Sequence, residues 1–191
     1  MGRLHDTLDD NLIDWIARQH LFFVATAPSE GGHVNLSPKG YDTFRVFDRS
    51  SVGYLDLTGS GVETIAHLRD NGRMTIMFCA FEGPPRILRL YGLGDVIEPI
   101  HDEFSRLAAH FPPTPGARAV IRLRLERIST SCGYAVPQMT FADDRDTLVE
   151  WAERKGSAGL AEYHEEKNVL SIDGLPGLAG SAGQRTAPSP S

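Results

Sequence analysis

The sequence has little of what marks exported, membrane-spanning or nucleic-acid-binding proteins. Its two cysteines, Cys79 and Cys132, form no CxxC pair and sit in apolar surroundings, which favours buried thiols over a disulfide or metal site. No apolar run reaches the roughly 18 residues of a membrane span, and the N-terminus lacks the apolar core of a signal peptide. The formal net charge of −6 disfavours nucleic-acid binding. We therefore expect a cytoplasmic protein without membrane or nucleic-acid partners.

Familiar catalytic and metal-binding motifs are missing as well. The seven histidines show neither HExxH nor another paired-ligand spacing, so surface or capping roles are predicted for them and no metal ligand is assigned. The chain has no GxSxG nucleophile elbow and no GK[ST] of a phosphate-binding loop. Asp42, Asp48 and Asp56 fall at strand ends or turns, where solvated aspartate is common, and we assign no catalytic carboxylate.

Length and composition predict one domain. A chain of 191 residues with 41% hydrophobic content can bury one sizeable core. We predict a single domain over residues 1–178, with a core at about 10–130 and a C-terminal helical extension at about 131–178. Residues 179–191 contain no large apolar side chain and are predicted to be disordered.

The pattern of elements is mainly β. Thr7 is the predicted cap of a first helix ending near His20, the runs LFFVATA and HVNLS indicate a hairpin, and RMTIMFCAF, apolar on both faces, is expected at the centre of the sheet. The segment ARAVIRLRLERI alternates between apolar and charged residues, while DDRDTLVEWAERKG and LAEYHEEKNVL indicate two later helices. Six or seven short strands with one helix among them predict an antiparallel barrel with peripheral helices.

The stretch LTGSGVETIAHLRDNGR has two possible interpretations. Ser60 and Glu63 match the S-x-x-E capping box, followed by a helix with Glu63 and His67 on its surface and a left-handed stop at Gly72. Alternatively, the free amides of the helix start and nearby hydroxyl groups bind a phosphate, with Lys39 as the nearest candidate cation. The local sequence leaves both open.

Taken in order, the segments FFVATA, VNLSPKG, GYLDLTGSGVETIAHLRDNGRMTIMF and RILRLYGLG resemble the flavin-binding split-barrel family related to pyridoxamine 5′-phosphate oxidase. The resemblance covers roughly residues 10 to 130, and the later SCGYAVP and SIDGLPGL resemble an uncharacterised branch of that family. It implies an FMN-binding split barrel and a homodimer with the cofactor at the subunit interface.

The resemblance also implies a set of cofactor-binding residues. Main-chain groups of the strand that includes Asn35, Leu36 and Ser37 would hold the flavin ring. The phosphate would lie at the helix start, although the family's basic pair is missing there. The side chains implied near the cofactor are Lys39, Thr58, Ser60, Thr64 and Arg86, and a solvated or paired arginine is the alternative for Arg86.

The implied activity is that of an FMN-dependent oxidoreductase acting on an unspecified small molecule, with the chemistry carried by the cofactor and no catalytic side chain assigned. The C-terminal Arg/His segment of true pyridoxamine phosphate oxidases has no counterpart in SCGYAVPQMTF or SIDGLPGL, so that specific activity is not expected. Two alternatives stay open. One is use of the deazaflavin F420, and the other is a non-enzymatic carrier of a flavin or haem-like ligand on the same fold.

Overall fold

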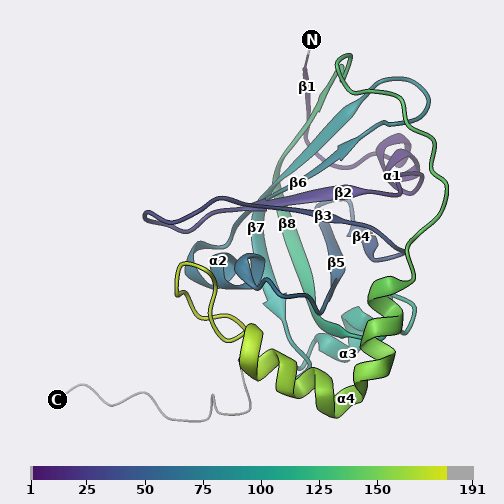
Figure 1. Ribbon diagram of the computed structural model, residues 1–191. Helices are drawn as coiled ribbons and strands as arrows, with labels where there is room; N and C mark the ends of the chain where they lie inside the picture. Colours follow the sequence, from purple (N-terminus) through teal and green to yellow (C-terminus); the bar gives the residue numbers. More distant parts are fainter. Residues whose placement is uncertain (1, 180–191) are drawn as a thin grey trace.

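A computed structural model of the protein describes residues 2–179. Within these residues, eight strands form one antiparallel sheet and four helices lie around it (Figure 1). The strands are β1 (Arg3–His5), β2 (Phe22–Thr26), β3 (Asn35–Lys39), β4 (Phe44–Asp48), β5 (Ser51–Leu57), β6 (Arg73–Cys79), β7 (Ile87–Ile97) and β8 (Ala117–Ser131). The helices are α1 (Asp10–Ile16), α2 (Glu63–Asn71), α3 (Phe104–Ala108) and α4 (Thr147–Lys167).

The sheet is curled into a half-barrel whose two edges stay apart. Its order is β3-β2-β6-β7-β8-β5-β4, and β1 pairs with the far end of β8. Strand β6 is bonded on both edges, which confirms the central position predicted for RMTIMFCAF. The long strand β8 pairs with β7 along its length and with β5 over its first half. The predicted antiparallel, mainly β fold with peripheral helices is therefore confirmed.

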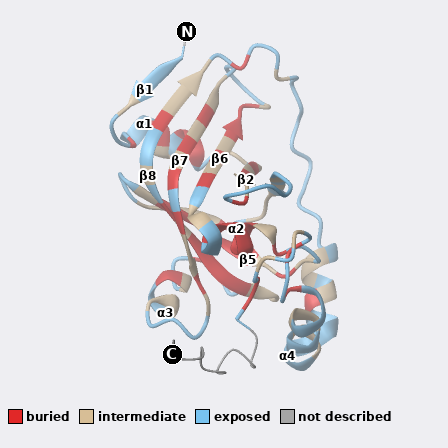
Figure 2. Ribbon diagram, turned by 90° about the vertical axis from the view of Figure 1, so that its left-hand side faces the viewer, coloured by how far each residue is buried: buried red, intermediate tan, exposed pale blue. Residues whose placement is uncertain are grey.

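The core follows from the alternation of apolar residues along these strands. Most buried side chains form one cluster, in which residues of β2, β6, β7 and β8 pack against α1 and α2, as the buried bands in Figure 2 show. A smaller cluster joins α3 to the other end of the sheet through Leu55, Leu107 and Val120. Helix α2 contributes Ile65 and Leu68 to the larger cluster and packs against β2, β6 and β7, so its position on the sheet is fixed.

The helix boundaries agree in part with the prediction. Gly72 ends α2 with a φ of 72°, the predicted left-handed stop. The N-cap of α1 is Asp9 rather than Thr7, because the Asp9 carboxylate accepts a hydrogen bond of 2.8 Å from the Leu12 amide. The helix ends at Ile16, earlier than predicted.

The C-terminal region shows the two predicted helices and an exposed thiol. The two predicted helices form α4, which is interrupted at Gly156, where φ is 64° and ψ is 175°. Cys79 is buried as predicted, but Cys132 is exposed because it follows the last residue of β8, beyond the core. The tail predicted to be disordered lies, from residue 180 onward, outside the described residues.

Candidate functional site

An open cleft separates β3 from the start of α2. It has a volume of about 590 Å³. One wall is formed by residues 33–36, the other by Ser60, Gly61 and Glu63, and Ile172 of the C-terminal segment completes it. Three of the predicted cofactor-binding residues, Asn35, Leu36 and Ser60, thus meet at one cleft although they lie far apart in the sequence.

A chain of polar side chains joins β3 to α2 beneath this cleft. The Asn35 amide nitrogen donates to the Thr26 and Thr64 hydroxyl oxygens at 3.1 and 3.0 Å. Its amide oxygen accepts from the Ser37 hydroxyl at 2.9 Å. Because Thr64 is buried and bonded to Asn35, its hydroxyl group holds the helix against the strand. Thr64 and Ser37 do not line the cleft, and their side chains bond within the protein next to it, so their predicted contacts with a cofactor stay predictions.

His67 extends this chain of polar groups into the core. Its Nδ1 lies 3.0 Å from the Thr26 hydroxyl oxygen, and the side chain is fully buried. Its Nε2 has no hydrogen-bond partner among the described residues. The predicted surface position of His67 is wrong, since the packing of α2 against β2 turns this face of the helix inward.

The N-terminus of α2 is not capped by a side chain. Its N-cap is Val62, with no side-chain cap hydrogen bond, so the predicted Ser60–Glu63 capping box is wrong. The Glu63 carboxylate instead accepts from the Ile172 amide at 3.2 Å. The amides of the first turn of an α-helix have no hydrogen-bond acceptor within the helix. In α2 these amides also lack a side-chain cap, and they lie beside the cleft.

Arg118, at the start of β8, supports the turn that leads into α2. Its guanidinium group is buried and donates to the carbonyl oxygens of Gly61 at 2.9 Å and Gly59 at 3.4 Å. These carbonyl groups are thereby drawn toward the interior, away from the cleft. Sequence reasoning missed Arg118 because it has the same strand parity as Arg122 and Arg124, on the face predicted to be wet.

A buried carboxylate joins two cations at this end of the sheet. Asp56 is 1% exposed, and its oxygens accept from Lys39 Nζ at 2.9 Å and Arg118 Nε at 2.7 Å. Burial acts to raise the pKa of Asp56, but attraction to Lys39 and Arg118 outweighs it and the pKa is lowered. The solvated position predicted for Asp56 is wrong. With Asp56 ionised, the three side chains carry a net charge of +1.

The predicted residues Thr58 and Arg86 do not line the β3–α2 cleft. The Thr58 hydroxyl group donates to the Gly116 carbonyl oxygen at 2.7 Å and lies 2.8 Å from His164 Nε2, so it attaches α4 to the sheet. Burial, and then the charge of Arg118, lower the pKa of His164, which favours its neutral form. Arg86 lies over the Trp15 ring, with its guanidinium carbon 5.5 Å from the ring centroid.

The segment after α4, residues 168–178, covers the turn at the start of α2 and is called the C-terminal strap below. The Asn168 side chain donates to the carbonyl oxygens of Gly59 and Ser60 at 3.0 and 3.4 Å and accepts from Arg118 at 2.9 Å. Leu178 is buried at its far end. The strap thereby holds Ile172 at the cleft, a contribution that no motif in the sequence indicated.

The described residues contain no helix long and apolar enough to cross a membrane. Within the same residues, no group of three or more His, Cys, Asp or Glu side chains is arranged to hold a metal ion.

Comparison with known proteins identifies relatives of the chain. Residues 8–132 match the family model described as pyridoxamine 5′-phosphate oxidase. The chain is 44% identical, over 195 aligned positions, to the pyridoxamine 5′-phosphate oxidase family protein ustO of Aspergillus flavus, covering 93% of this chain and 78% of that protein.

Two solved structures share the fold at lower identity. HupZ of Group A Streptococcus is 24% identical with a TM-score of 0.51, over 63% of this chain and 91% of that one. A putative pyridoxamine 5′-phosphate oxidase from Lactobacillus delbrueckii is 20% identical with a TM-score of 0.51, over 65% and 94% of the two chains.

Proposed function

Because the chain belongs to the pyridoxamine 5′-phosphate oxidase family, we propose that it binds FMN in the β3–α2 cleft and acts as a flavin-dependent oxidoreductase on a small molecule. The observation that carries the proposal is the uncapped N-terminus of α2, which faces a cleft of about 590 Å³ beside an edge strand. Such a helix end supplies amide donors and a favourable dipole for an anionic group.

The phosphate would lie at the first turn of α2. Ser60 contributes a hydroxyl group at the rim of the cleft. Arg118 and Lys39 exceed Asp56 by one positive charge, which favours an anion there and compensates in part for the absent basic pair. Glu63 lines the cleft and its negative charge offsets this excess, because the hydrogen bond from the Ile172 amide does not neutralise a carboxylate. The anion would therefore be held mainly by the free amides of α2 and the Ser60 hydroxyl group. The residues present therefore fit a phosphate-bearing cofactor.

The ring of the cofactor would lie along β3. As an edge strand, β3 is bonded to β2 on one side, and main-chain groups on its other side are available to a ligand. Leu36 and Ile172 provide apolar walls for the ring. When bound, the flavin supplies hydride transfer, while this chain binds and orients it.

A homodimer with the cofactor at the subunit interface is part of the proposal. Val34, just before β3, is 77% exposed, Leu36 in β3 is 62% exposed, and Ile172, which lines the same cleft, is 72% exposed. A second copy packed over these side chains would remove an apolar patch from water and close the cleft. Lys39, Thr58 and Arg86 do not line this cleft, so their predicted contacts with the cofactor stay predictions and are not part of the proposal.

Calorimetric titration with FMN and with riboflavin tests the phosphate site. The two ligands share the ring and differ in the phosphate, so FMN should bind more tightly by about 1.5–3 kcal/mol. Ser60→Ala should narrow that difference, whereas Ser157→Ala, an exposed serine in α4, should leave it unchanged. Equal affinity of the unaltered protein for FMN and riboflavin would contradict a phosphate site at the N-terminus of α2.

A separate measurement distinguishes an enzyme from a carrier. The flavin-loaded protein is reduced and its reoxidation is followed by absorbance with a panel of small-molecule acceptors. An oxidoreductase should be reoxidised faster than free reduced FMN by at least one acceptor. Rates that equal those of free FMN throughout would favour the carrier. Titration with F420 in place of FMN tests the remaining alternative.

A further inference from the structure

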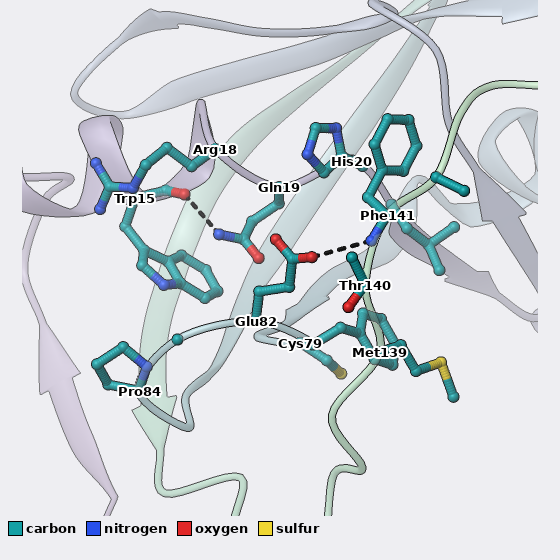
Figure 3. Close-up of a pocket in the computed structure, with 14 residues that line it drawn as sticks. Trp15, Arg18, Gln19, His20, Cys79, Glu82, Pro84, Met139, Thr140 and Phe141 are labelled. Atoms are coloured by element: carbon teal, nitrogen blue, oxygen red, sulfur yellow. Dashed lines mark hydrogen bonds between the residues drawn. The ribbon is translucent and has the colours of Figure 1, made fainter.

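A second hollow lies at the opposite end of the sheet, between α1 and the turn that joins β6 to β7. Its volume is about 480 Å³, and its walls are largely apolar, with Trp15, Phe81, Met139 and Phe141 among them (Figure 3). The His20 and Phe141 rings stack at a centroid distance of 3.8 Å. We call it the apolar hollow.

The segment that closes the apolar hollow is bonded to the β6–β7 turn. The Met139 amide donates to the Phe81 carbonyl oxygen at 3.0 Å. The Phe141 amide donates to the Glu82 carboxylate at 2.9 Å, the bond drawn in Figure 3. Residues 139–142 are thereby fixed as a wall of a formed pocket, which is the kind of cavity that takes small ligands.

A basic cleft adjoins the apolar hollow. It also has a volume of about 480 Å³, and it is lined by Arg3, Arg18 and Arg86 together with Thr130. The two spaces share Trp15, Arg18 and Pro84, so they are neighbouring parts of one surface depression. One side of Trp15 therefore faces apolar side chains and another faces guanidinium groups, with Arg86 over its ring.

The charges of the three arginines of the basic cleft are not neutralised by an ion pair within the described residues. Within residues 2–179, none of their side chains forms an ion pair or donates a hydrogen bond, and Arg86 makes only the ring contact with Trp15. By contrast, Arg45, Arg118 and Arg122 all bond to carboxylates.

Two carboxylates belong to this region, and both bond to backbone amides. Asp9 caps α1 through the Leu12 amide, and Glu82 accepts from the Phe141 amide. The guanidinium and carboxylate groups alone, three against two, leave a net charge of +1 around the two spaces. Guanidinium groups are suited to bidentate binding of carboxylate or phosphate.

From this juxtaposition we propose that the apolar hollow and the basic cleft together bind an amphipathic organic anion, with its apolar body against Trp15 and Met139 and its oxyanion head group at Arg18 and Arg86. The head group is a carboxylate or a phosphate, which the same guanidinium groups can bind. The site shares no lining residue with the β3–α2 cleft, so the proposal does not rest on FMN binding.

Titration of the full chain with 2-naphthoate and with the neutral 2-naphthamide tests this proposal. Both probes carry the same ring system, so the naphthoate should bind about ten to a hundred times more tightly if the arginines hold the acid group. Arg18→Ala should reduce that preference about tenfold. Met139→Ser should weaken both probes alike. Arg154→Ala, an exposed arginine of α4, is the matched control and should change neither.

Fluorescence locates the bound probe. The two tryptophans are Trp15, at the depression, and Trp151 in α4. In the Trp151→Phe protein, naphthoate should quench the remaining emission, and Arg18→Ala should shift that quenching to higher concentration. Titration with naphthyl phosphate beside naphthoate distinguishes the two head groups. The probe that binds more tightly carries the head group that the site prefers.

Three results would overturn the proposal. The first is equal affinity for naphthoate and naphthamide. The second is a preference for naphthoate that Arg18→Ala leaves unchanged. The third is the absence of quenching in the folded Trp151→Phe protein, as expected if a second copy of the chain covers this surface. Because FMN affinity is measured separately, failure here leaves the flavin proposal unaffected.

Discussion

The two ends of the sheet hold positive charge in opposite ways. At the β3–α2 end, Lys39 and Arg118 share the buried Asp56 carboxylate. At the α1 end, Arg18 and Arg86 lie beside an open depression and form no ion pair within the described residues.

The difference separates a charge that shapes the backbone from a charge that is available to a ligand. Arg118 is bonded to Asp56, Asn168 and two turn carbonyl groups, so it cannot move toward a ligand and acts by orienting the turn before α2. Arg18 has no such partners and can follow the position of an anion. Substitutions at the β3–α2 end should therefore lower the free energy of unfolding, whereas substitutions at the α1 end should lower the affinity for an anion.

The largest expected effect on stability is at Asp56. Asp56→Asn keeps the shape of the side chain but leaves the buried Arg118 and the partly buried Lys39 without a counter-charge. The free energy of unfolding should fall by about 3–5 kcal/mol, as expected when one partner of a buried ion pair is removed. Urea denaturation followed by circular dichroism measures it. A loss below about 1 kcal/mol would mean that the buried ion pair contributes no more than a surface one.

The same carboxylate should make stability depend on pH. The pKa of Asp56 is lower in the folded protein than its unfolded value of about 3.9, so its contribution is present above about pH 4 and is lost as pH falls through the folded pKa. The unfolding free energy of the native protein should decline below about pH 4. Asp56→Asn should show a shallower decline in the same titration, and parallel curves would contradict the assignment.

A smaller effect is expected where the C-terminal strap crosses the start of α2. A Cβ atom at Gly177 would collide with the Asn168 carbonyl oxygen and lie 2.8 Å from the Val62 side chain. Gly177→Ala should destabilise the protein by about 1–3 kcal/mol and speed hydrogen exchange of the Leu178 amide, which bonds to Asn168. Gly59→Ala is the control, because the added Cβ meets no atom within 4 Å. Equal effects of the two changes would contradict close packing of the strap.

The smallest effect is expected at an exposed ion pair. Arg154 and Glu150 lie one helical turn apart in α4, with 3.4 Å between Arg154 Nη1 and Glu150 Oε2. Their side chains are 66% and 60% exposed. Arg154→Ala should change the unfolding free energy by about 0.3–0.5 kcal/mol, because solvent screens such pairs. Thermal denaturation of Arg154→Ala and Asp56→Asn measures the change in unfolding free energy in each. A comparable decrease in the two variants would contradict the difference proposed between buried and exposed charges.

Local elements could be predicted because their signals lie in neighbouring residues. The apolar spacing of α2 predicted its buried side, and Gly72 was recognised as its stop because glycine adopts a positive φ readily. The β2–β3 hairpin and the central β6 followed from their apolar patterns. The resemblance over four ordered segments placed Asn35, Leu36 and Ser60 at one site, and the structure brings these three residues together.

The supporting residues of the site could not be predicted in the same way. The S-x-x-E pattern indicated a capping box, yet Glu63 bonds to Ile172, more than 100 residues later. Asp56 was predicted to be solvated because it falls at a strand end, and Arg118 was not singled out because it shares the parity of the other charged residues of its strand. Their burial depends on the pairing of β5 with β8 and on the C-terminal strap that covers them.

The sequence by itself determined the antiparallel sheet, the buried face of α2 and its glycine stop, because backbone preference and apolar periodicity act over a few residues. Only the tertiary structure decided which charges are neutralised and which are left for a ligand. Ion pairing depends on distances between side chains that are remote along the chain: Asp56 meets Arg118 across two strands, whereas nothing in the described fold brings a carboxylate into an ion pair with Arg18.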